Sequence, residues 1–337
     1  MKAAVLYGRE DVRIENIQAP ALNPGEVRVR IGAALTCGTD LKVYRRGYHA
    51  AMITPPAVFG HEFAGTIEEV AEDTTPWLPG MRVVAANSAP CGQCRYCEQG
   101  QPNLCDDLLF LNGAYAESIV VPKRIAEQNL IELPADLTFS DAALTEPLAC
   151  VVQGLNDCDI HAGQRILVIG SGPIGLMFAA LANHAGADVH LAGRGESRLQ
   201  MATQFGAQTY LVSGNDVVAA VSVAGPFDVV IEAVGKPQCW QAAVDLVRKG
   251  GTVNFFGGCP KGTSITLDTE RIHYSNLKLL ASFHHTPAAI RTALEHIQAG
   301  RIRAEQFVTG ACTLDELPDV FRDMARGNWA VKTLVNP

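Results

Sequence analysis

The stretch RILVIGSGPIG, residues 165–175, decides the fold of this 337-residue chain. Residues 165–169 predict a short buried strand, and a Gly-x-Gly-x-x-Gly pattern follows it, made of Gly170, Ser171, Gly172, Pro173, Ile174 and Gly175. After a buried strand and at the start of a helix, this pattern is typical of a loop that binds a dinucleotide pyrophosphate. Its glycines permit a tight turn, close approach of backbone amides to the phosphates, and close packing of helix on strand. The alternative is a glycine turn with a purely structural role.

Strand and helix signals alternate on both sides of that loop. Predicted strands at 189–191, 228–231, 252–256 and 277–280 are separated by predicted helices at 173–185, 196–205 and 237–247, with a further helix at 141–156 before them. Such alternation indicates right-handed crossovers and a parallel sheet. Residues 1–140 instead contain short alternating strands, such as 26–31 and 65–70, between proline- and glycine-rich turns. These predict an irregular β-barrel-like domain.

The predicted fold class is therefore α/β, with two domains. Residues 1–148 form the first part of the β-rich domain and residues 149–283 form the Rossmann domain, a doubly wound parallel sheet. Residues 284–337, which begin with a predicted helix at 287–299, return to the first domain. A length of 337 residues, with 48% hydrophobic and 18% charged residues, is sufficient for two cores.

Charge and hydropathy exclude some classes of partner. The net charge is −8 and no basic run is present, which argues against a nucleic-acid partner. No stretch approaches the ~20 apolar residues that span a membrane, and the first residues enter a strand without a cleavable signal. Six of the ten cysteines are scattered widely, which favours a reducing compartment. We expect a cytoplasmic protein.

The other four cysteines form a cluster with metal-ligand spacing. Cys91, Cys94, Cys97 and Cys105 follow the pattern Cys-x2-Cys-x2-Cys-x7-Cys, and four thiolates can converge on one zinc ion. Disulfides are disfavoured because neighbours this close cannot all pair without strain. An iron–sulfur cluster is the serious rival, but there the fourth cysteine follows after three residues and precedes a proline. We predict a structural zinc in a lobe at 88–107, with no coordination position left for chemistry.

The tip of the second Rossmann strand bears on the choice of cofactor. An enzyme that prefers NAD places an acid there, about 20 residues after the glycine loop, to bind the ribose hydroxyls. In this chain Gly193 and Arg194 occupy the tip, and Asp188 lies at the other end of the strand. A guanidinium in place of a carboxylate favours the 2′-phosphate of NADP, and Arg198 could assist. NAD, with Arg194 as a solvated loop residue, is the alternative.

A second set of candidate ligands lies in the β-rich domain. Cys37-Gly38-Thr39-Asp40 and Gly60-His61-Glu62 precede the cysteine lobe, and Glu146 lies near the domain junction. A thiolate, an imidazole and one or two carboxylates can hold zinc and leave a position for water or substrate. Taken singly, His61 would be a satisfied buried histidine and Cys37 a packing residue.

In this order, the motifs resemble those of the zinc-dependent medium-chain alcohol dehydrogenases, in the sorbitol and polyol dehydrogenase branch. The resemblance covers essentially the whole chain and implies a GroES-like catalytic domain beside the Rossmann domain. It implies Cys37, His61 and Glu146 as ligands of a catalytic zinc, and Glu62 as a carboxylate that binds or exchanges at the metal. It further implies Thr39 as the hydroxyl that passes the substrate's proton, and the four clustered cysteines as the structural zinc site. A small alcohol or ketone substrate and a homodimer or homotetramer are also implied.

Three hypotheses for function follow. The favoured one is an NADP-linked, zinc-dependent dehydrogenase of a secondary alcohol such as a polyol, sugar or cyclitol. A zinc-free quinone or enone reductase and a non-enzymatic binding protein are the rivals, and the complete ligand set counts against both. Lys42 stands where many relatives carry histidine, which counts against L-threonine as substrate. His284 and His285 are predicted either to touch cofactor or substrate, or to lie in a turn capped by Thr286.

Overall fold

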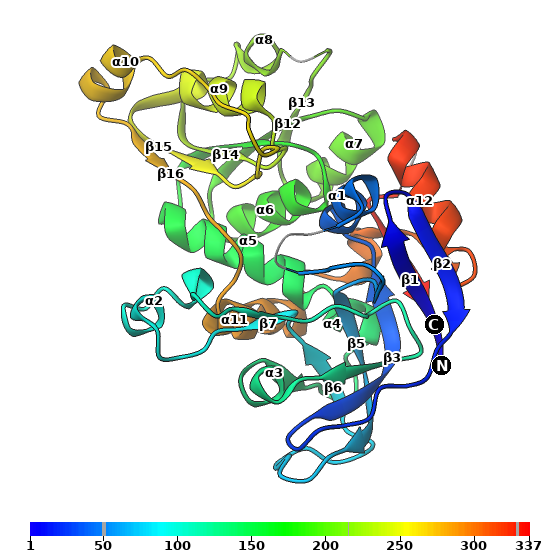
Figure 1. The fold of residues 1–337 in the computed structure, drawn as a ribbon. Helices are drawn as coiled ribbons and strands as arrows, with labels where there is room; N and C mark the ends of the chain where they lie inside the picture. The colour runs from blue at the N-terminus through cyan, green and yellow to red at the C-terminus, as the bar shows by residue number, and fades with distance from the viewer. Residues whose placement is uncertain (49–51, 215, 328–329) are drawn as a thin grey trace. The chain divides into compact units, whose positions relative to one another are not determined.

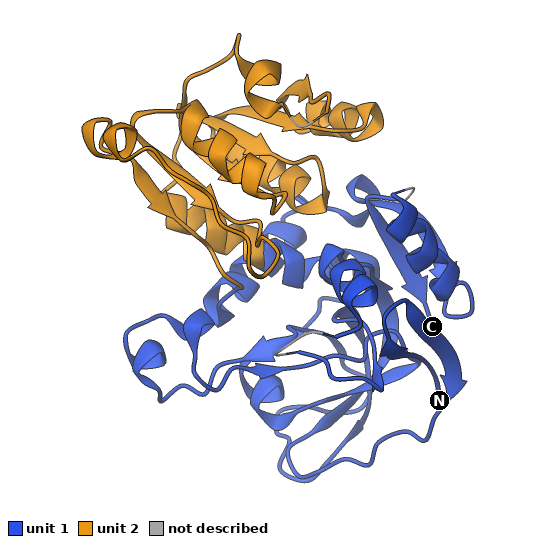
Figure 2. Ribbon diagram, turned by 45° about the horizontal axis from the view of Figure 1, so that its top comes forward, with its two compact units in different colours: residues 1–149, 285–337 blue, residues 150–284 orange. Residues whose placement is uncertain are grey.

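The computed structural model describes residues 1–48, 52–214, 216–327 and 330–337. The chain divides into two compact units (Figure 2). The first contains residues 1–149 and 285–337, and the second contains residues 150–284. The first unit is therefore discontinuous in sequence.

The second unit is built on a parallel sheet. Its strands are β11 (Arg165–Ile169), β12 (Asp188–Gly193), β13 (Gln208–Leu211), β14 (Phe227–Glu232), β15 (Val247–Phe255) and β16 (Lys278–Leu280). They pair in the order β13-β12-β11-β14-β15-β16, all parallel. The order reverses between β11 and β14, so this is the doubly wound Rossmann arrangement, and the predicted fold class is confirmed.

Helices connect these strands (Figure 1). They are α6 (Pro173–His184), α7 (Glu196–Gln204), α8 (Val217–Val221), α9 (Pro237–Leu246) and α10 (Thr269–Tyr274), and α5 (Thr145–Cys158) precedes the first strand. Residues 166–169 of β11 are all buried, as expected of a central strand in a parallel sheet. The helix predicted at 141–156 is wrong in its start. A short helix, α4 (Phe139–Ala142), ends first, and α5 begins at Thr145, whose hydroxyl bonds to the carbonyl of Ala142.

The first unit is rich in antiparallel strands. Its strands are β1 (Lys2–Gly8), β2 (Asp11–Asn16), β3 (Val27–Leu35), β4 (Ala57–Val58), β5 (Glu62–Val70), β6 (Arg82–Ala85), β7 (Ser88–Ala89), β8 (Leu109–Phe110), β9 (Ser118–Val121), β10 (Leu130–Glu132), β17 (Val308–Thr313) and β18 (Lys332–Asn336). The largest sheet has the order β10-β6-β5-β3-β18-β17, and β9 also pairs with β3. Strand β3 is largely buried because it is paired on both sides. Strand β18 pairs with β3 at Leu334 and Leu35, which brings the end of the chain beside the end of β3.

Short helices close the first unit. They are α1 (Gly38–Arg46), α2 (Arg95–Glu98), η1 (Pro102–Leu104), α3 (Lys123–Gln128), α4, α11 (Pro287–Gln298), η2 (Ala304–Gln306) and α12 (Leu317–Arg326). Helix α11 begins at Pro287, and the hydroxyl of Thr286 accepts the N–H of Ala289 at 3.1 Å, so the predicted cap is confirmed. No helix in the described part of the chain combines the length and the apolar character that crossing a membrane requires.

Candidate functional site

Cys37 occupies the N-cap of α1, two residues after the end of β3. Its sulfur accepts the backbone N–H of Thr39 at 3.4 Å, and its own backbone N–H donates to the carboxylate of Asp40 at 3.1 Å. This capping box satisfies two amides that the helix start would otherwise leave without partners. The sequence Cys-Gly-Thr-Asp thus fixes the position of a half-buried thiol.

His61 is placed by the turn that leads into β5. Gly60 before it has φ +90°, and a Cβ at this position would lie 2.7 Å from the ring of Tyr115, so only glycine fits. The imidazole is buried, and its Nδ1 lies 2.9 Å from Oδ1 of Asp40. Because the ionised carboxylate of Asp40 only accepts, we assign the proton to Nδ1. In the neutral imidazole, the lone pair of Nε2 is then available to a metal ion.

The charges around His61 favour a cation. Burial by itself would lower the pKa of His61, but the negative charges of Asp40 and Cys37 oppose this effect. As a result, the pKa of His61 lies well above its ordinary value. The same negative charges would stabilise a dication bound at this place.

Glu62, the first residue of β5, is fully buried and ion-paired. Its Oε2 lies 2.5 Å from Nζ of Lys332, which also donates to the backbone carbonyl of Thr36 at 3.0 Å. Burial raises the pKa of Glu62 although Lys332 opposes it. Burial alone would lower the pKa of Lys332, but the negative charges of Glu62, Cys37 and Glu146 together raise it. The other oxygen, Oε1, is buried and has no hydrogen-bond partner among the described residues. Burying an oxygen without a partner costs free energy unless another group, such as a metal ion, binds it.

Cys37, His61 and Glu62 form one group, in which one ligand atom from each residue lies within 4.8 Å of the others. Zinc binds thiolate, imidazole and carboxylate ligands, and Oε1 of Glu62, which has no hydrogen-bond partner among the described residues, is available to an ion. Three protein ligands are the pattern of a catalytic zinc site, since the fourth position stays open. These residues therefore fit the metal.

Glu146 is not a member of that group. It lies in the first turn of α5 and is buried, with Oε1 3.8 Å from Nε2 of His285. His285 is buried as well, and its Nε2 lies 2.9 Å from Oδ1 of Asn87. Burial raises the pKa of Glu146 to about 7, and the charges of His61 and Glu62 also act on it. Glu146 is therefore close enough to the group to respond to its charges.

The remaining predicted residues of this region differ in exposure. Thr39 is half-buried in the first turn of α1, two residues after Cys37, and Lys42 is exposed one turn later. His284 belongs to the second unit and has φ +62°, in the left-handed region.

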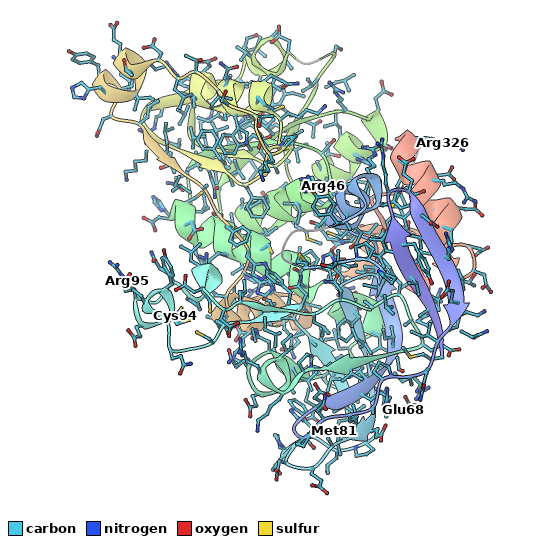
Figure 3. The ribbon with its side chains drawn as sticks, in the orientation of Figure 1. Arg46, Glu68, Met81, Cys94, Arg95 and Arg326 are labelled. Carbon is cyan, nitrogen blue, oxygen red and sulfur yellow. The ribbon has the colours of Figure 1, made fainter. Side chains whose placement is uncertain are left out.

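The four clustered cysteines come together on a loop that projects from the first unit, where Cys94 is labelled in Figure 3. Sulfur atoms from all four lie within 4.8 Å of one another, and none is in a disulfide. The turns of the loop require Gly92 and Gly100, which have φ +77° and +75°. Backbone N–H groups of Cys97 and Asp106 lower the pKa of Cys94 to about 6. Four convergent thiols, one of them with a lowered pKa, fit a closed zinc site.

In the second unit, the glycine loop joins β11 to α6. Gly170 has φ +124°, and Gly172 is the N-cap of α6. A Cβ at Gly175 would lie 1.8 Å from the carbonyl oxygen of Gly170, so this glycine is needed for packing. A Cβ at Gly172 would meet nothing within 4 Å, and the backbone there is open to a ligand. Together with the helix N-terminus, this opening suits a pyrophosphate.

The tip of β12 is held close to the same loop. A Cβ at Gly193 would lie 2.5 Å from Cβ and Oγ of Ser171, so a side chain at residue 193 has no room. The hydroxyl of Ser171 donates to the carbonyl of Arg194 at 2.7 Å. The guanidinium of Arg194 donates to the carbonyl of Gly214, and burial lowers the pKa of the nearby Arg198. Two cationic side chains thus follow a position that excludes an acid.

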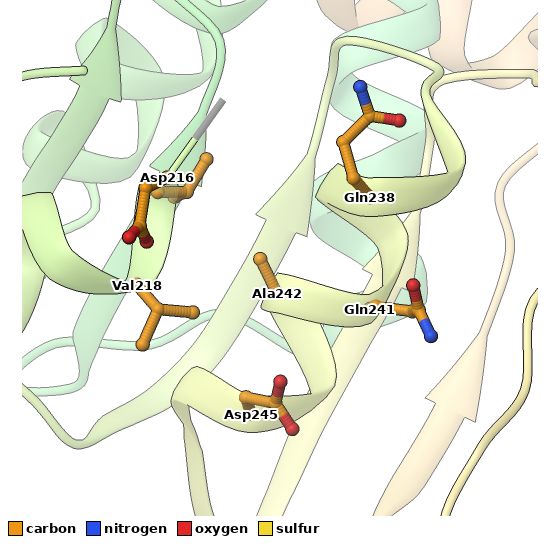
Figure 4. Close-up of a pocket in the computed structure, with 7 residues that line it drawn as sticks. Asp216, Val218, Gln238, Gln241, Ala242 and Asp245 are labelled. Atoms are coloured by element: carbon orange, nitrogen blue, oxygen red, sulfur yellow. The ribbon is translucent and has the colours of Figure 1, made fainter. Parts of the chain in front are cut away.

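A separate hollow of about 460 Å³ lies between α8 and α9 and is lined by Asp216, Val217, Val218, Gln238, Gln241, Ala242 and Asp245 (Figure 4). None of the residues predicted from the sequence lines it. It therefore has no part in the candidate site.

Sequence reasoning missed the residues that hold the ligands in place. Asp40, Lys332, Tyr115 and Asn87 are all buried. Two signals were available. Asp40 stands at the N3 position of a capping box, and Lys332 lies in the sequence between Ala330-Val331 and Leu334-Val335, where a lysine among apolar residues indicates a buried ion pair.

Known proteins resemble both halves of the chain. Residues 23–135 match the family described as "Alcohol dehydrogenase GroES-like domain", and residues 173–299 match "Zinc-binding dehydrogenase". A sorbitol dehydrogenase of Bombyx mori is 31% identical over 99% of this chain and 98% of its own length. A D-altritol 5-dehydrogenase of Agrobacterium fabrum is 36% identical over 77% of each chain.

Solved structures agree. A NADP-bound protein of Sinorhizobium meliloti 1021, described as a zinc-binding dehydrogenase, has a TM-score of 0.90 and 32% identity, covering 100% of this chain and 99% of that one. The alcohol dehydrogenase TADH of Thermus sp. ATN1 has a TM-score of 0.88 and 29% identity with the same coverage. With the geometry above, these findings show that the chain is an oxidoreductase of the zinc-dependent medium-chain alcohol dehydrogenase family, in the branch of the sorbitol dehydrogenases.

Proposed function

We propose that this enzyme interconverts a secondary alcohol and a ketone with NADP(H), and that its substrate is a polyol, a sugar or a cyclitol. The observation that carries the proposal is the group of Cys37, His61 and Glu62, in which the buried Oε1 of Glu62 has no hydrogen-bond partner among the described residues. The names of the Bombyx and Agrobacterium relatives denote polyol dehydrogenases, which supports this substrate class.

The proposed ligands of the catalytic zinc are Cys37, His61 and Glu146, with Glu62 as a carboxylate that binds or exchanges. A zinc ion held there would act as a Lewis acid toward the substrate oxygen. Asp40 binds the Nδ1 side of His61, which directs Nε2 toward a metal ion, and Lys332 donates to Oε2 of Glu62, which leaves Oε1 for that ion. The proposed structural site is Cys91, Cys94, Cys97 and Cys105.

Oxidation of a secondary alcohol removes a hydride from carbon and a proton from oxygen. A bound nicotinamide cofactor would supply the hydride acceptor, and the proton must leave through the protein. We assign its passage to the hydroxyl of Thr39, which is half-buried two residues after Cys37. A hydroxyl is a weak base, so Thr39 passes the proton on rather than keeping it, and returns it in the reverse reaction.

The proposed cofactor site is the glycine loop, residues 170–175, with the tip of β12. Close contact with Ser171 leaves no space at Gly193 for the acid that an NAD enzyme uses. The guanidinium groups of Arg194 and Arg198 provide the positive charge that a 2′-phosphate requires. The similar Sinorhizobium protein has NADP bound.

Metal analysis and a substrate panel test the proposal. We expect two zinc ions per chain, and turnover of polyols or sugars with NADP that is lost when zinc is removed and returns when it is restored. A protein with one zinc per chain, or with undiminished turnover after zinc removal, would contradict it.

Arginine variants test the choice of cofactor. Arg194→Ala with Arg198→Ala should weaken NADP binding at least tenfold, or about 1.4 kcal/mol, and leave NAD binding nearly unchanged. Binding is measured by cofactor fluorescence. Lys249→Ala is the control. Lys249 lies near the start of β15, whereas the glycine loop follows the end of β11, so the two are at opposite ends of the parallel strands. Equal losses for both cofactors would rule out 2′-phosphate recognition.

We also propose that the enzyme acts as a homodimer or homotetramer in the cytoplasm. None of the ten cysteines, all in the described part of the chain, forms a disulfide, which suits a reducing compartment. Light scattering after gel filtration measures the subunit number, and a monomer would contradict the proposal.

A further inference from the structure

Tyr115 is fully buried and does not belong to the metal-ligand group of Cys37, His61 and Glu62. Its hydroxyl lies 2.5 Å from Oδ2 of Asp40 and 3.1 Å from the backbone carbonyl oxygen of Leu35. A phenol has one proton to donate, and an ionised carboxylate is a stronger acceptor than a carbonyl. The hydroxyl therefore donates to Asp40.

Asp40 is held by donors on both oxygens. Oδ2 accepts the hydroxyl of Tyr115 and the backbone N–H of Cys37, whereas Oδ1 accepts Nδ1–H of His61. Because the two oxygens belong to one rigid carboxylate, the bonds to Oδ2 set the direction in which Oδ1 meets His61. The orientation of the imidazole thus depends on a chain of buried hydrogen bonds that begins at Tyr115.

The ring of Tyr115 also supports His61, through packing against the residue that precedes it. It packs against the α-carbon of Gly60, which directly precedes His61, so closely that a Cβ there would be 2.7 Å away. Hydrogen bonds fix the backbone of Tyr115, since its N–H donates to the carbonyl of Phe59 at 2.8 Å and its carbonyl accepts the N–H of Ala4 at 2.8 Å. Phe59 and Phe321 also pack on the ring. Tyr115 is therefore a rigid support for both His61 and Asp40.

We propose that Tyr115 is a positioning residue for the catalytic metal, which acts through Asp40 to hold His61 in its metal-binding orientation. This inference rests on the proposed function, because it needs His61 to be a metal ligand. Outer-shell partners of this kind typically contribute 10- to 100-fold to metal affinity. Tyr115 lies one bond beyond Asp40, so we expect an effect at the lower end of that range.

Tyr115→Phe tests the proposal because it removes the hydroxyl and keeps the ring against Gly60. We expect zinc affinity at the Cys37 and His61 site to fall about tenfold, measured by equilibrium competition with a chromogenic chelator. With Co²⁺ in place of zinc, the visible ligand-field bands of that site should shift. The four-cysteine site, in the same sample, is the internal reference and should keep its metal.

Tyr44→Phe is the matched control. Tyr44 is buried in the same aromatic cluster and stacks on Phe321, but it is not a partner of Asp40 in the network described above. It should change neither the affinity nor the cobalt spectrum. Asp40→Asn should lower the affinity more than Tyr115→Phe does, and the double variant should lose no more than Asp40→Asn alone.

The outcomes separate the inference from the proposed function. If the unaltered enzyme holds only the cysteine-cluster metal, both fail. If it holds two metals and Tyr115→Phe changes neither affinity nor spectrum, only the inference fails. Losses that add fully in the double variant would also overturn it, because Tyr115 would then act by packing and not through Asp40. If Tyr115→Phe folds poorly, Asp40→Asn, made with and without Tyr44→Phe, still measures whether the carboxylate of Asp40 orients His61. An unchanged cobalt spectrum in Asp40→Asn would then overturn the inference.

Discussion

The two metal centres of the first unit are built in opposite ways. The four-cysteine centre takes all its ligands from one loop at residues 91–105, where three of the four sulfurs belong to half-buried residues. The other centre groups Cys37, His61 and Glu62 from the start of α1 and the start of β5, each tied to a buried partner, and the proposed ligand Glu146 comes from α5. The first is a local structure and the second depends on the whole domain.

This difference follows from coordination. Four thiolates complete a tetrahedron, so the metal itself organises the loop that binds it. A site with an open position receives less order from its metal, and the protein must hold the ligands with its own hydrogen bonds and packing. The buried network of Asp40, Lys332 and Tyr115 supplies that order around the open site.

Cys37→Ala should have the largest effect. It removes a ligand of the open site, so turnover should fall roughly a thousandfold, about 4 kcal/mol of activation free energy, and the zinc content should fall from two to one per chain. Steady-state kinetics and metal analysis measure both. Cys312→Ala, at a buried cysteine of β17 outside both centres, is the control and should keep two zinc ions. Activity retained in Cys37→Ala would show that the two centres have been assigned the wrong roles.

Lys332→Met should lower the free energy of unfolding by about 3 kcal/mol, because it leaves the buried charge of Glu62 without its partner. Urea denaturation measures the change. Lys332→Met combined with Glu62→Gln removes both charges and should recover most of the loss. If the single variant is as stable as the unaltered enzyme, the open site does not depend on its buried ion pair, and the contrast between the centres is weaker than we infer.

Cys105→Ser should have a smaller and more local effect. Loss of one thiolate opens the closed site, and the free energy of unfolding should fall by about 2 kcal/mol, since the loop has little other support. Hydrogen exchange should increase over residues 91–105 and stay unchanged in β3 and β5. The metal at Cys37 and His61 should remain. A simultaneous loss of both metals would contradict the independence of the two centres.

What the sequence could predict follows the same contrast. The cysteine cluster and the glycine loop are contiguous, so spacing alone indicated their ligands. Cys37 and His61 gained meaning only from the resemblance to a family, because spacing does not say which strands become neighbours. The contribution of Lys332 depends on the pairing of β18 with β3, a register between distant segments that periodicity cannot reveal.

The fold was predictable where elements are long or marked by glycine and proline. The Rossmann strands before residue 193 and the helices that begin at Pro173, Pro237 and Pro287 were predicted close to their observed limits. Strand β13 and helices α8 and α10 were missed because each has six residues or fewer, which is too short for a period to show. The tight contact of Gly193 with Ser171 could not be foreseen, since it joins the end of β12 to the glycine loop, which meet only in the folded sheet.

The smallest expected effect concerns thiol reactivity in metal-depleted protein. Backbone N–H groups of Cys97 and Asp106 lower the pKa of Cys94 to about 6, whereas burial raises the pKa of Cys105 to about 12. The thiolate of Cys94 is therefore present above about pH 6 and is lost as the pH falls through that value. Alkylation by iodoacetamide, followed by mass spectrometry from about pH 5 to about pH 9, should label Cys94 well before Cys105. Urea-unfolded protein is the control, in which both thiols should titrate near their ordinary value of ~8.5. Equal labelling of Cys94 and Cys105 in the folded protein would contradict this expectation. It would mean that the loop loses the backbone arrangement around Cys94 without metal, so that the metal, and not the turns of the loop, organises this centre.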